Sequence, residues 1–176
     1  MNRRVTLRRR DTRLESEGAE FLVLGELLIR GIPAYKTYRN MPGYDLVALD
    51  PDRDRSAHIS VKSRWVTDAT GFIIKNFNCD FVVVAKLNRG TKKDRGKIMP
   101  PEFFVLPVET LKNVPRSKGW NRIRFGSVPY FKSYLGRWDL IRTFLSRSGK
   151  QSRRASIRRL TIRSTPTRAR NPVRAR

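Results

Sequence analysis

Two apolar segments in the second half of the chain constrain its fold most strongly. Residues 78–88 (NCDFVVVAKLN) and 100–113 (PPEFFVLPVETLKN) are apolar almost without interruption over the length of a strand. A strand with one polar face would alternate instead, so both segments are predicted to lie inside a sheet that is covered on its two faces. Such a sheet needs further elements packed on each side.

Two helices are predicted to provide part of this cover. The first occupies residues 15–32, where one stripe is apolar apart from Glu20, and it ends at Gly31 followed by Pro33. The second lies within residues 133–147. The two stripes consist of Leu24, Leu27, Leu28 and Gly31 in the first helix, and of Leu135, Trp138, Ile141 and Leu145 in the second.

A strand hairpin is predicted between the first helix and the apolar segments. Residues 35–50 (YKTYRNMPGYDLVALD) indicate an extended run, a Pro-Gly turn and a strand over 44–49. The turn at 50–55 leads into a further strand over 57–65. The order of helix, strands and final helix predicts an α/β fold with a central mixed sheet of about four to five strands flanked by helices.

The positive charge is concentrated at the two ends of the chain. Lysine and arginine total 39 against 15 acidic residues, which gives a net charge of +24. Residues 1–10 carry five arginines and no acid, and residues 147–176 carry eleven basic residues and no acid, which leaves +8 for residues 11–146. We therefore divide the chain into a basic arm (1–12), a folded domain (13–146) and an arginine-rich tail (147–176) that we expect to be disordered when free.

This charge predicts a polyanionic partner, nucleic acid first and an anionic membrane surface second. Residues 89–100 (RGTKKDRGKIMP) form a basic loop that is expected to contact phosphates, with a merely solvated loop as the alternative. For the tail, a solvated segment with a generic affinity for phosphate is the favoured interpretation. The residues expected to contact nucleic acid are Lys92, Lys93, Arg95 and Lys97 in the loop and Arg153, Arg154, Arg158 and Arg159 in the tail.

Composition excludes several classes of protein. The single cysteine, Cys79, rules out an internal disulfide bond, and with one histidine, His58, a Cys/His zinc site is implausible. No apolar run reaches the roughly 18 residues needed to span a bilayer, and the basic start is not followed by the apolar core of a signal peptide. We expect a cytoplasmic protein without a membrane partner, with Cys79 and the tryptophans Trp65, Trp120 and Trp138 in the core; base stacking by a tryptophan is the alternative.

A lysine in the middle of an apolar strand is the most informative single residue. Within HISVKSRW (58–65), a period of two places Ser60 and Lys62 on one face, together with the histidine. Such a lysine needs a charged partner or a wet cleft, unless its strand lies at a sheet edge facing solvent. Asp45 in the preceding strand and Glu20 on the first helix are the natural partners. Each acid also has a purely structural interpretation. Asp45 is then a residue of the preceding turn, and Glu20 lies at the edge of the apolar stripe with its carboxylate in solvent.

Together these segments resemble the PD-(D/E)XK (restriction-endonuclease-like) nuclease superfamily. The resemblance runs from about Glu17 to Leu111 and rests on the helix glutamate followed by R-G-I, on G-Y-D-L-V and on I-S-V-K-S. By position, Glu20 matches the helix glutamate of the family, Asp45 the strand aspartate and Lys62 the lysine. Ser60 stands where the family usually has aspartate or glutamate, and a Gly-Tyr pair replaces the proline before the aspartate.

The resemblance implies a restriction-endonuclease-like core and a DNA endonuclease that depends on Mg²⁺ or Mn²⁺. Glu20, Asp45 and the carbonyl of Val61 would hold the metal, and Lys62 would assist the attacking water and stabilise the phosphate. DNA is favoured over RNA. A homodimer is among the expected arrangements, because nucleases that cut both strands often dimerise.

The serine leaves three readings open. In the first, Glu20, Asp45 and the Val61 carbonyl hold the metal and Ser60 binds a ligated water. In the second, an acid has moved to another position, for which Asp80 is the candidate. In the third, the site is inactive and the fold serves as a DNA- or RNA-binding module. A structural ribonucleoprotein component is the rival from another class, because basic tails on a small domain would suffice for it.

Overall fold

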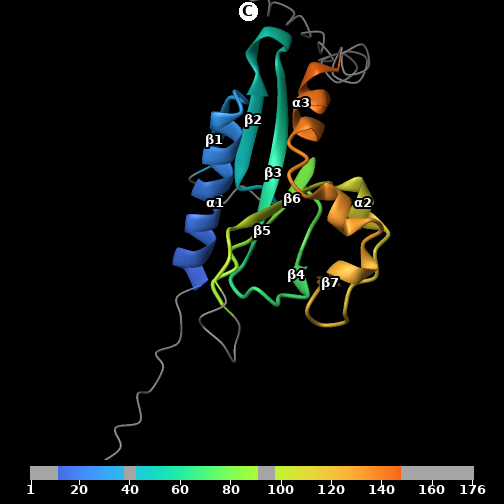
Figure 1. Cartoon of the computed structure of the whole chain (residues 1–176). Helices are drawn as coiled ribbons and strands as arrows, with labels where there is room; N and C mark the ends of the chain where they lie inside the picture. The colour runs from blue at the N-terminus through green and yellow to red at the C-terminus, as the bar shows by residue number, and fades with distance from the viewer. Residues whose placement is uncertain (1–11, 38–42, 91–97, 148–176) are drawn as a thin grey trace, which may run out of the picture.

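A five-stranded sheet lies at the centre of the computed structural model, which describes residues 12–37, 43–90 and 98–147. The strand order is β1-β2-β3-β5-β6. β3 and β5 are parallel and the other neighbours are antiparallel, so the sheet is mixed, as predicted (Figure 1). The strands are β1 (Ala34–Lys36), β2 (Leu46–Asp50), β3 (Arg55–Arg64), β5 (Phe81–Lys86) and β6 (Glu102–Pro107).

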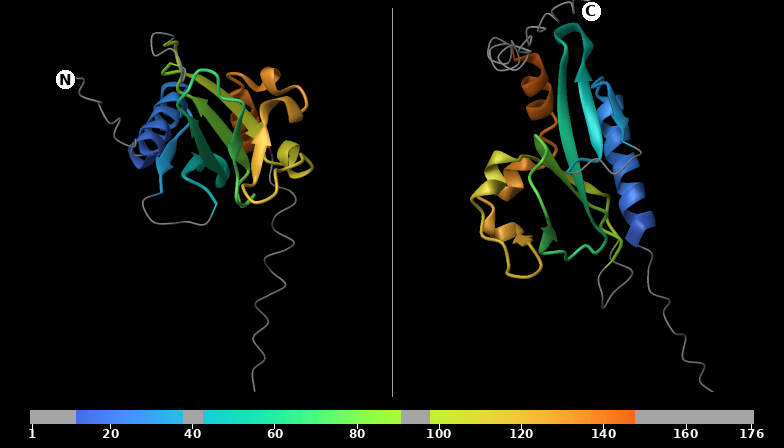
Figure 2. Two further views of the ribbon diagram at one scale, coloured as in Figure 1. Left: turned by 90° about the horizontal axis from the view of Figure 1, so that it is seen from below. Right: turned by 180° about the vertical axis from the view of Figure 1, so that it is seen from behind.

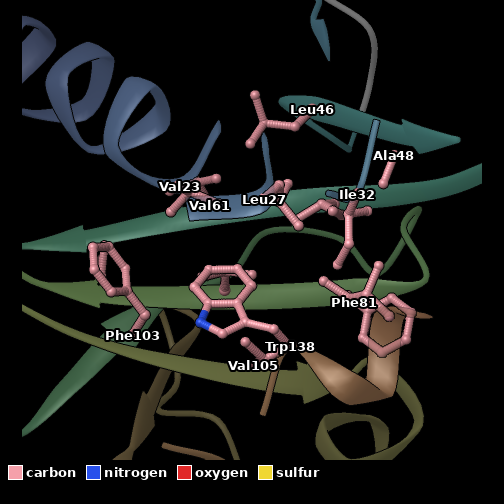
Figure 3. Packing of buried hydrophobic residues seen from close by; sticks show 14 of the residues in the cluster. Val23, Leu27, Ile32, Leu46, Ala48, Val61, Phe81, Phe103, Val105 and Trp138 are labelled. Carbon is pink, nitrogen blue, oxygen red and sulfur yellow. The ribbon is translucent and has the colours of Figure 1, made fainter. Parts of the chain in front are cut away.

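One face of the sheet is covered by α1 (Thr12–Ile29) and α3 (Asp139–Ser146), which share one apolar cluster with it. Within that cluster Trp138 packs near Val105 and Phe103, its ring centroid 5.8 Å from that of Phe103 (Figure 3). The buried stripe of α1 is shifted by one residue toward the N-terminus relative to the predicted stripe. As a result Leu28 is exposed and Glu20 lies beside the stripe. The buried residues of α1 are Ala19, Val23 and Leu27.

The opposite face is covered by elements that the sequence pattern did not predict. A two-stranded ribbon of β4 (Gly71–Ile73) and β7 (Arg122–Arg124) lies there with the short helix α2 (Glu109–Lys112). Figure 2 shows α1 and this ribbon on opposite sides of the sheet. Three 3₁₀ turns complete the order of elements: η1 (Pro51–Arg53), η2 (Phe125–Ser127) and η3 (Phe131–Tyr134). The sheet is therefore the middle layer of three.

Several expectations about single elements were wrong. The second apolar segment forms β6 at an edge of the sheet, where the bridge between Phe104 and Leu135 helps to cover it. The last helix begins only at Asp139, because the turn at Gly136, with a φ of +64°, interrupts the helical pattern. Trp120 is 74% exposed, whereas Trp138 is in the core as expected.

Much of the basic sequence lies outside the described residues. This applies to the arm up to residue 11, to residues 91–97 of the basic loop and to the tail from residue 148. Among the helices of the described part, none combines the length and the apolar character needed to cross a membrane.

Candidate active site

Asp45 is fixed at the point where β2 begins. Its backbone N–H donates to the carbonyl of Ile59 at 2.9 Å, and its own carbonyl accepts from the N–H of Thr37 at 3.0 Å. The side chain turns toward β3, where Oδ2 accepts from the N–H of Val61 at 2.6 Å and from Oγ of Ser60 at 3.3 Å. The carboxylate is thus held against the strand that carries the lysine.

Gly43 sets how the chain approaches Asp45. Gly43 has a φ of +113°, which other residues rarely adopt. A Cβ atom at this position would also lie 2.5 Å from Cβ of Asn78. The chain therefore needs glycine at Gly43 to bring Asp45 into the sheet alongside the 76–78 turn.

Asp45, Ser60 and Lys62 line one pocket of about 230 Å³. Ser60 and Lys62 point to the same side because they are two residues apart on β3. β3 lies between β2 and β5, so the alternative of a lysine on an edge strand is wrong. Among the described residues, no side chain forms a hydrogen bond or an ion pair with the Lys62 ammonium. The lysine is therefore available to a ligand in the pocket.

Glu20 does not line this pocket but lies close enough to interact with Asp45. Its carboxylate forms an ion pair with Lys36 on β1, and Lys36 also pairs with Glu17 at 2.9 Å. The side chains of Glu20 and Lys36 are 15% and 7% exposed. Burial raises the pKa of Glu20; the hydrogen bond from Lys36 opposes this rise, and the negative charge of Asp45 adds to it.

Lys36 is a charged residue near the pocket that the sequence analysis did not single out. Burial alone would lower the pKa of its ammonium group, but the hydrogen bonds to Glu20 and Glu17 outweigh burial and raise it. A signal was present, since Tyr35-Lys36-Thr37 is a short extended run directly after the glutamate-bearing helix. Lys75 was also missed; it is exposed in the bend that follows β4 and lines the same pocket as Lys62.

Asp80 is engaged elsewhere on the sheet. Its Oδ2 accepts from the N–H of His58 at 2.8 Å and lies 3.2 Å from Nδ1 of the same residue. The His58 ring in turn packs against Tyr44, with 4.3 Å between the centroids. Asp80 is not among the residues that line the pocket, so the structure gives no support to the reading in which it replaces the missing acid.

The potential ligand atoms around Asp45 are oxygens, the type of ligand that a hard divalent cation prefers. Mg²⁺ is commonly bound through one or two carboxylates, with water and substrate phosphate as the other ligands. The pocket offers the Asp45 carboxylate and the Ser60 hydroxyl, with the charge of Glu20 nearby. In the described part of the chain, no group of three or more His, Cys, Asp or Glu side chains is arranged to hold a metal. Substrate oxygens would have to complete such a site.

Cys79 lies in the apolar cluster behind the pocket and is buried, as expected. Burial raises the pKa of its thiol to about 11; the positive charge of Lys62 opposes this rise, and the negative charge of Asp80 adds to it. The thiol has the character of a small hydrophobe, not of a nucleophile.

We expect Cys79 to resist alkylation in the folded protein. With a pKa of about 11, the thiolate fraction at pH ~8 is on the order of one in a thousand, roughly a hundredfold below that of an ordinary thiol. The folded state holds this proton more tightly than the unfolded state, so the stabilisation is present below about pH 9 and is lost as the pH rises toward 11. Iodoacetamide labelling followed by mass spectrometry measures the rate, and fast labelling without denaturant would contradict the burial of the thiol.

The basic residues that were expected to contact nucleic acid lie outside the described residues. They are Lys92, Lys93, Arg95 and Lys97 in the loop and Arg153, Arg154, Arg158 and Arg159 in the tail. Their contacts stay predictions.

Comparison with known proteins identifies a related fold. The structure is similar to that of a bacterial homing endonuclease, I-Ssp6803I, with a TM-score of 0.50 and 20% sequence identity. The match covers 76% of this chain and 93% of that one. No protein-family model matches the sequence, and no curated protein matches it either. The likeness extends over nearly the whole of the endonuclease and shows that the two chains share a fold.

Proposed function

We propose that this chain is a divalent-metal-dependent endonuclease of the PD-(D/E)XK superfamily that hydrolyses phosphodiester bonds of DNA. The observation that supports this most is the pocket in which Asp45, Ser60 and Lys62 meet, within a fold shared with a homing endonuclease. In this proposal residues 13–146 form the nuclease domain. The arm and the tail add phosphate affinity that falls with salt. The enzyme acts in the cytoplasm, as a homodimer where both strands are cut.

Each residue of the pocket has a distinct role in this proposal. Asp45 would hold Mg²⁺ or Mn²⁺, with the Ser60 hydroxyl and the Val61 carbonyl as further oxygen donors. When bound, the metal supplies Lewis-acid stabilisation of the phosphate and lowers the pKa of a water molecule. Lys62 orients the attacking water and stabilises negative charge on the phosphate. Glu20, while paired with Lys36, adds negative charge beside Asp45 that favours a cation.

Cleavage by the wild type should require the metal. The rate should fall at least about a hundredfold in Lys62→Met, because a side chain positioned to orient water or to stabilise charge contributes roughly 10²–10⁴ in rate. Methionine keeps the length of the side chain and disturbs no contact of the ammonium within the described residues. The assay follows plasmid and short duplex, single-stranded and RNA substrates with Mg²⁺, Mn²⁺ or EDTA. Lys132→Met, at an exposed position of η3, is the matched control. Unchanged cleavage in Lys62→Met would show that the lysine takes no part in the reaction.

A second candidate function is a catalytically inactive nuclease fold that binds DNA or RNA. The observation that favours it is the small number of acidic groups: Ser60 replaces the usual acid, and Glu20 is bonded to Lys36. A silent wild type and an active Ser60→Glu variant would support this candidate, because the added carboxylate restores the second acid at a position that already faces the pocket. If both proteins are silent and Asp45→Asn leaves binding unchanged, a structural ribonucleoprotein component becomes the better account.

A further inference from the structure

A second, larger pocket of about 620 Å³ opens beside the first one, over the β4–β7 ribbon. Four arginines line it: Arg64 from β3, Arg116 from the loop before β7, and Arg122 and Arg124 from β7. No acidic residue is among the residues that line it. We refer to these four arginines together with Trp120 as the arginine–tryptophan cleft.

The four guanidinium groups have few partners of their own. Among the described residues, none of them forms an ion pair with a carboxylate. Arg122 donates from Nη2 to Oγ1 of Thr70 at 2.6 Å, and the Arg116 guanidinium lies 5.1 Å from the ring centroid of Phe77. Nε of Arg64 and Nε of Arg122 are buried without a hydrogen-bond acceptor. A row of arginines without carboxylates is suited to phosphate oxygens, which the planar guanidinium binds with two parallel hydrogen bonds.

Trp120 projects into solvent at the rim of the same cleft. Its 74% exposure is unusual for a tryptophan, and it sits in a tight turn between Gly119 (φ +81°) and Asn121 (φ +49°). The turn is hydrogen-bonded from Asn121 N–H to the carbonyl of Ser117 at 3.1 Å, so the ring is presented by a defined loop. An exposed aromatic ring among arginines is typical of surfaces on which an unpaired base stacks.

The ribbon is built so that the arginines face outward. Gly71 is opposite Arg124 and Ile73 opposite Arg122, while Phe72 and Ile123 between them are buried. The cleft is also continuous with the candidate active site. Ile73 lines both pockets, and Arg64 follows Lys62 by two residues on the same face of β3. A strand that reaches Lys62 would therefore pass along Arg64 into the cleft.

We propose that the arginine–tryptophan cleft binds the segment of nucleic acid next to the scissile phosphate, with the arginines on its phosphates and an unpaired base on Trp120. The preferred substrate therefore carries single-stranded nucleotides, such as an overhang or an open junction, beside the cleaved bond. The location of the scissile phosphate at Lys62 rests on the proposed function. The binding of an unpaired strand by the cleft does not.

The test measures binding of the full-length protein in EDTA, where metal-dependent cleavage is absent. The probes are a labelled 12-nucleotide single strand and the blunt duplex of the same sequence. Stacking of a base on an aromatic ring contributes strongly to single-strand affinity, so Trp120→Leu should weaken single-strand binding about tenfold and leave duplex binding nearly unchanged. The single strand should also quench tryptophan fluorescence in the wild type and much less in Trp120→Leu.

The double variant Arg116→Gln/Arg124→Gln should weaken single-strand binding. It should also reduce the slope of the logarithm of the binding constant against the logarithm of salt concentration by the equivalent of about two phosphate contacts. The matched control is Arg53→Gln/Arg142→Gln, which removes the same charge from another pocket, one that also contains Asp50 and Asp52. This control should bind the single strand almost as the wild type does.

The outcomes separate this inference from the proposed function. Binding that is unchanged in both cleft variants overturns the inference, even if metal-dependent cleavage is observed. Weakened single-strand binding without any cleavage supports the cleft while the nuclease proposal fails. Equal weakening of single strand and duplex by Trp120→Leu overturns the preference for an unpaired base, because a base inside a duplex is already stacked between its neighbours.

Discussion

Replacing Asp45 with asparagine should reduce metal-dependent cleavage at least about a thousandfold, which corresponds to roughly 4 kcal/mol in the activation free energy, and should leave the fold nearly unchanged. The amide oxygen of asparagine can still accept the hydrogen bond from the Val61 N–H, which is 2.6 Å long in the wild type. The negative charge, however, is lost from the pocket in which a cation would bind. Single-turnover cleavage and thermal unfolding, measured on the same preparation, test the two halves of this expectation.

The alanine variant at the same position separates charge from structure. Asp45→Ala also removes the acceptor of the Val61 N–H and of the Ser60 hydroxyl, and a buried donor without a partner costs about 1–3 kcal/mol. We therefore expect equal loss of cleavage in both variants and a lower melting temperature in the alanine variant alone. Asp52→Asn, at an exposed position of η1, is the control for a change of charge away from the pocket. Cleavage that persists in Asp45→Asn would show that the carboxylate is not needed to hold a metal.

The neighbourhood of Asp45, Ser60 and Lys62 was predictable because it depends on local pairing. Two residues of one strand that are two apart share a face, and the short turn at 51–54 forces β2 and β3 to pair. The same reasoning gave the mixed sheet and its helices. The fold class was therefore confirmed, whereas the chemical roles of the three residues stay predictions that the cleavage assays decide.

The β4–β7 ribbon was not predictable by these means. Each strand has three residues, and the paired segments are about fifty positions apart, so neither one leaves a periodic pattern in the sequence. The pairing depends on Gly71, where a Cβ atom would lie 2.2 Å from the carbonyl oxygen of Ile123. The exposure of Trp120 follows from this tertiary arrangement. For the same reason the arginine–tryptophan cleft became visible only in the structure.

Lys36→Met should lower the free energy of unfolding by about 3 kcal/mol at neutral pH, because it leaves the largely buried carboxylate of Glu20, whose side chain is 15% exposed, without its partner. Chemical denaturation measures this change. Lys112→Met is the matched control: its ammonium lies 2.6 Å from Glu109, but both side chains are largely exposed, so we expect a change of no more than about 0.5 kcal/mol. If the two substitutions cost the same, burial does not strengthen the Lys36–Glu20 pair.

The pH dependence and a double variant show whether the loss arises at Glu20. Lys36 opposes the rise in the pKa of Glu20, so its removal raises that pKa further. A raised carboxyl pKa gives stability that is present below the unfolded pKa and lost as the pH rises through the folded one. The deficit of Lys36→Met should therefore be largest near pH ~7 and shrink toward pH ~4. Lys36→Met/Glu20→Gln should recover most of the stability, because it removes both charges together. If cleavage survives in this double variant, Glu20 acts on the fold through Lys36 and is not required to hold the metal.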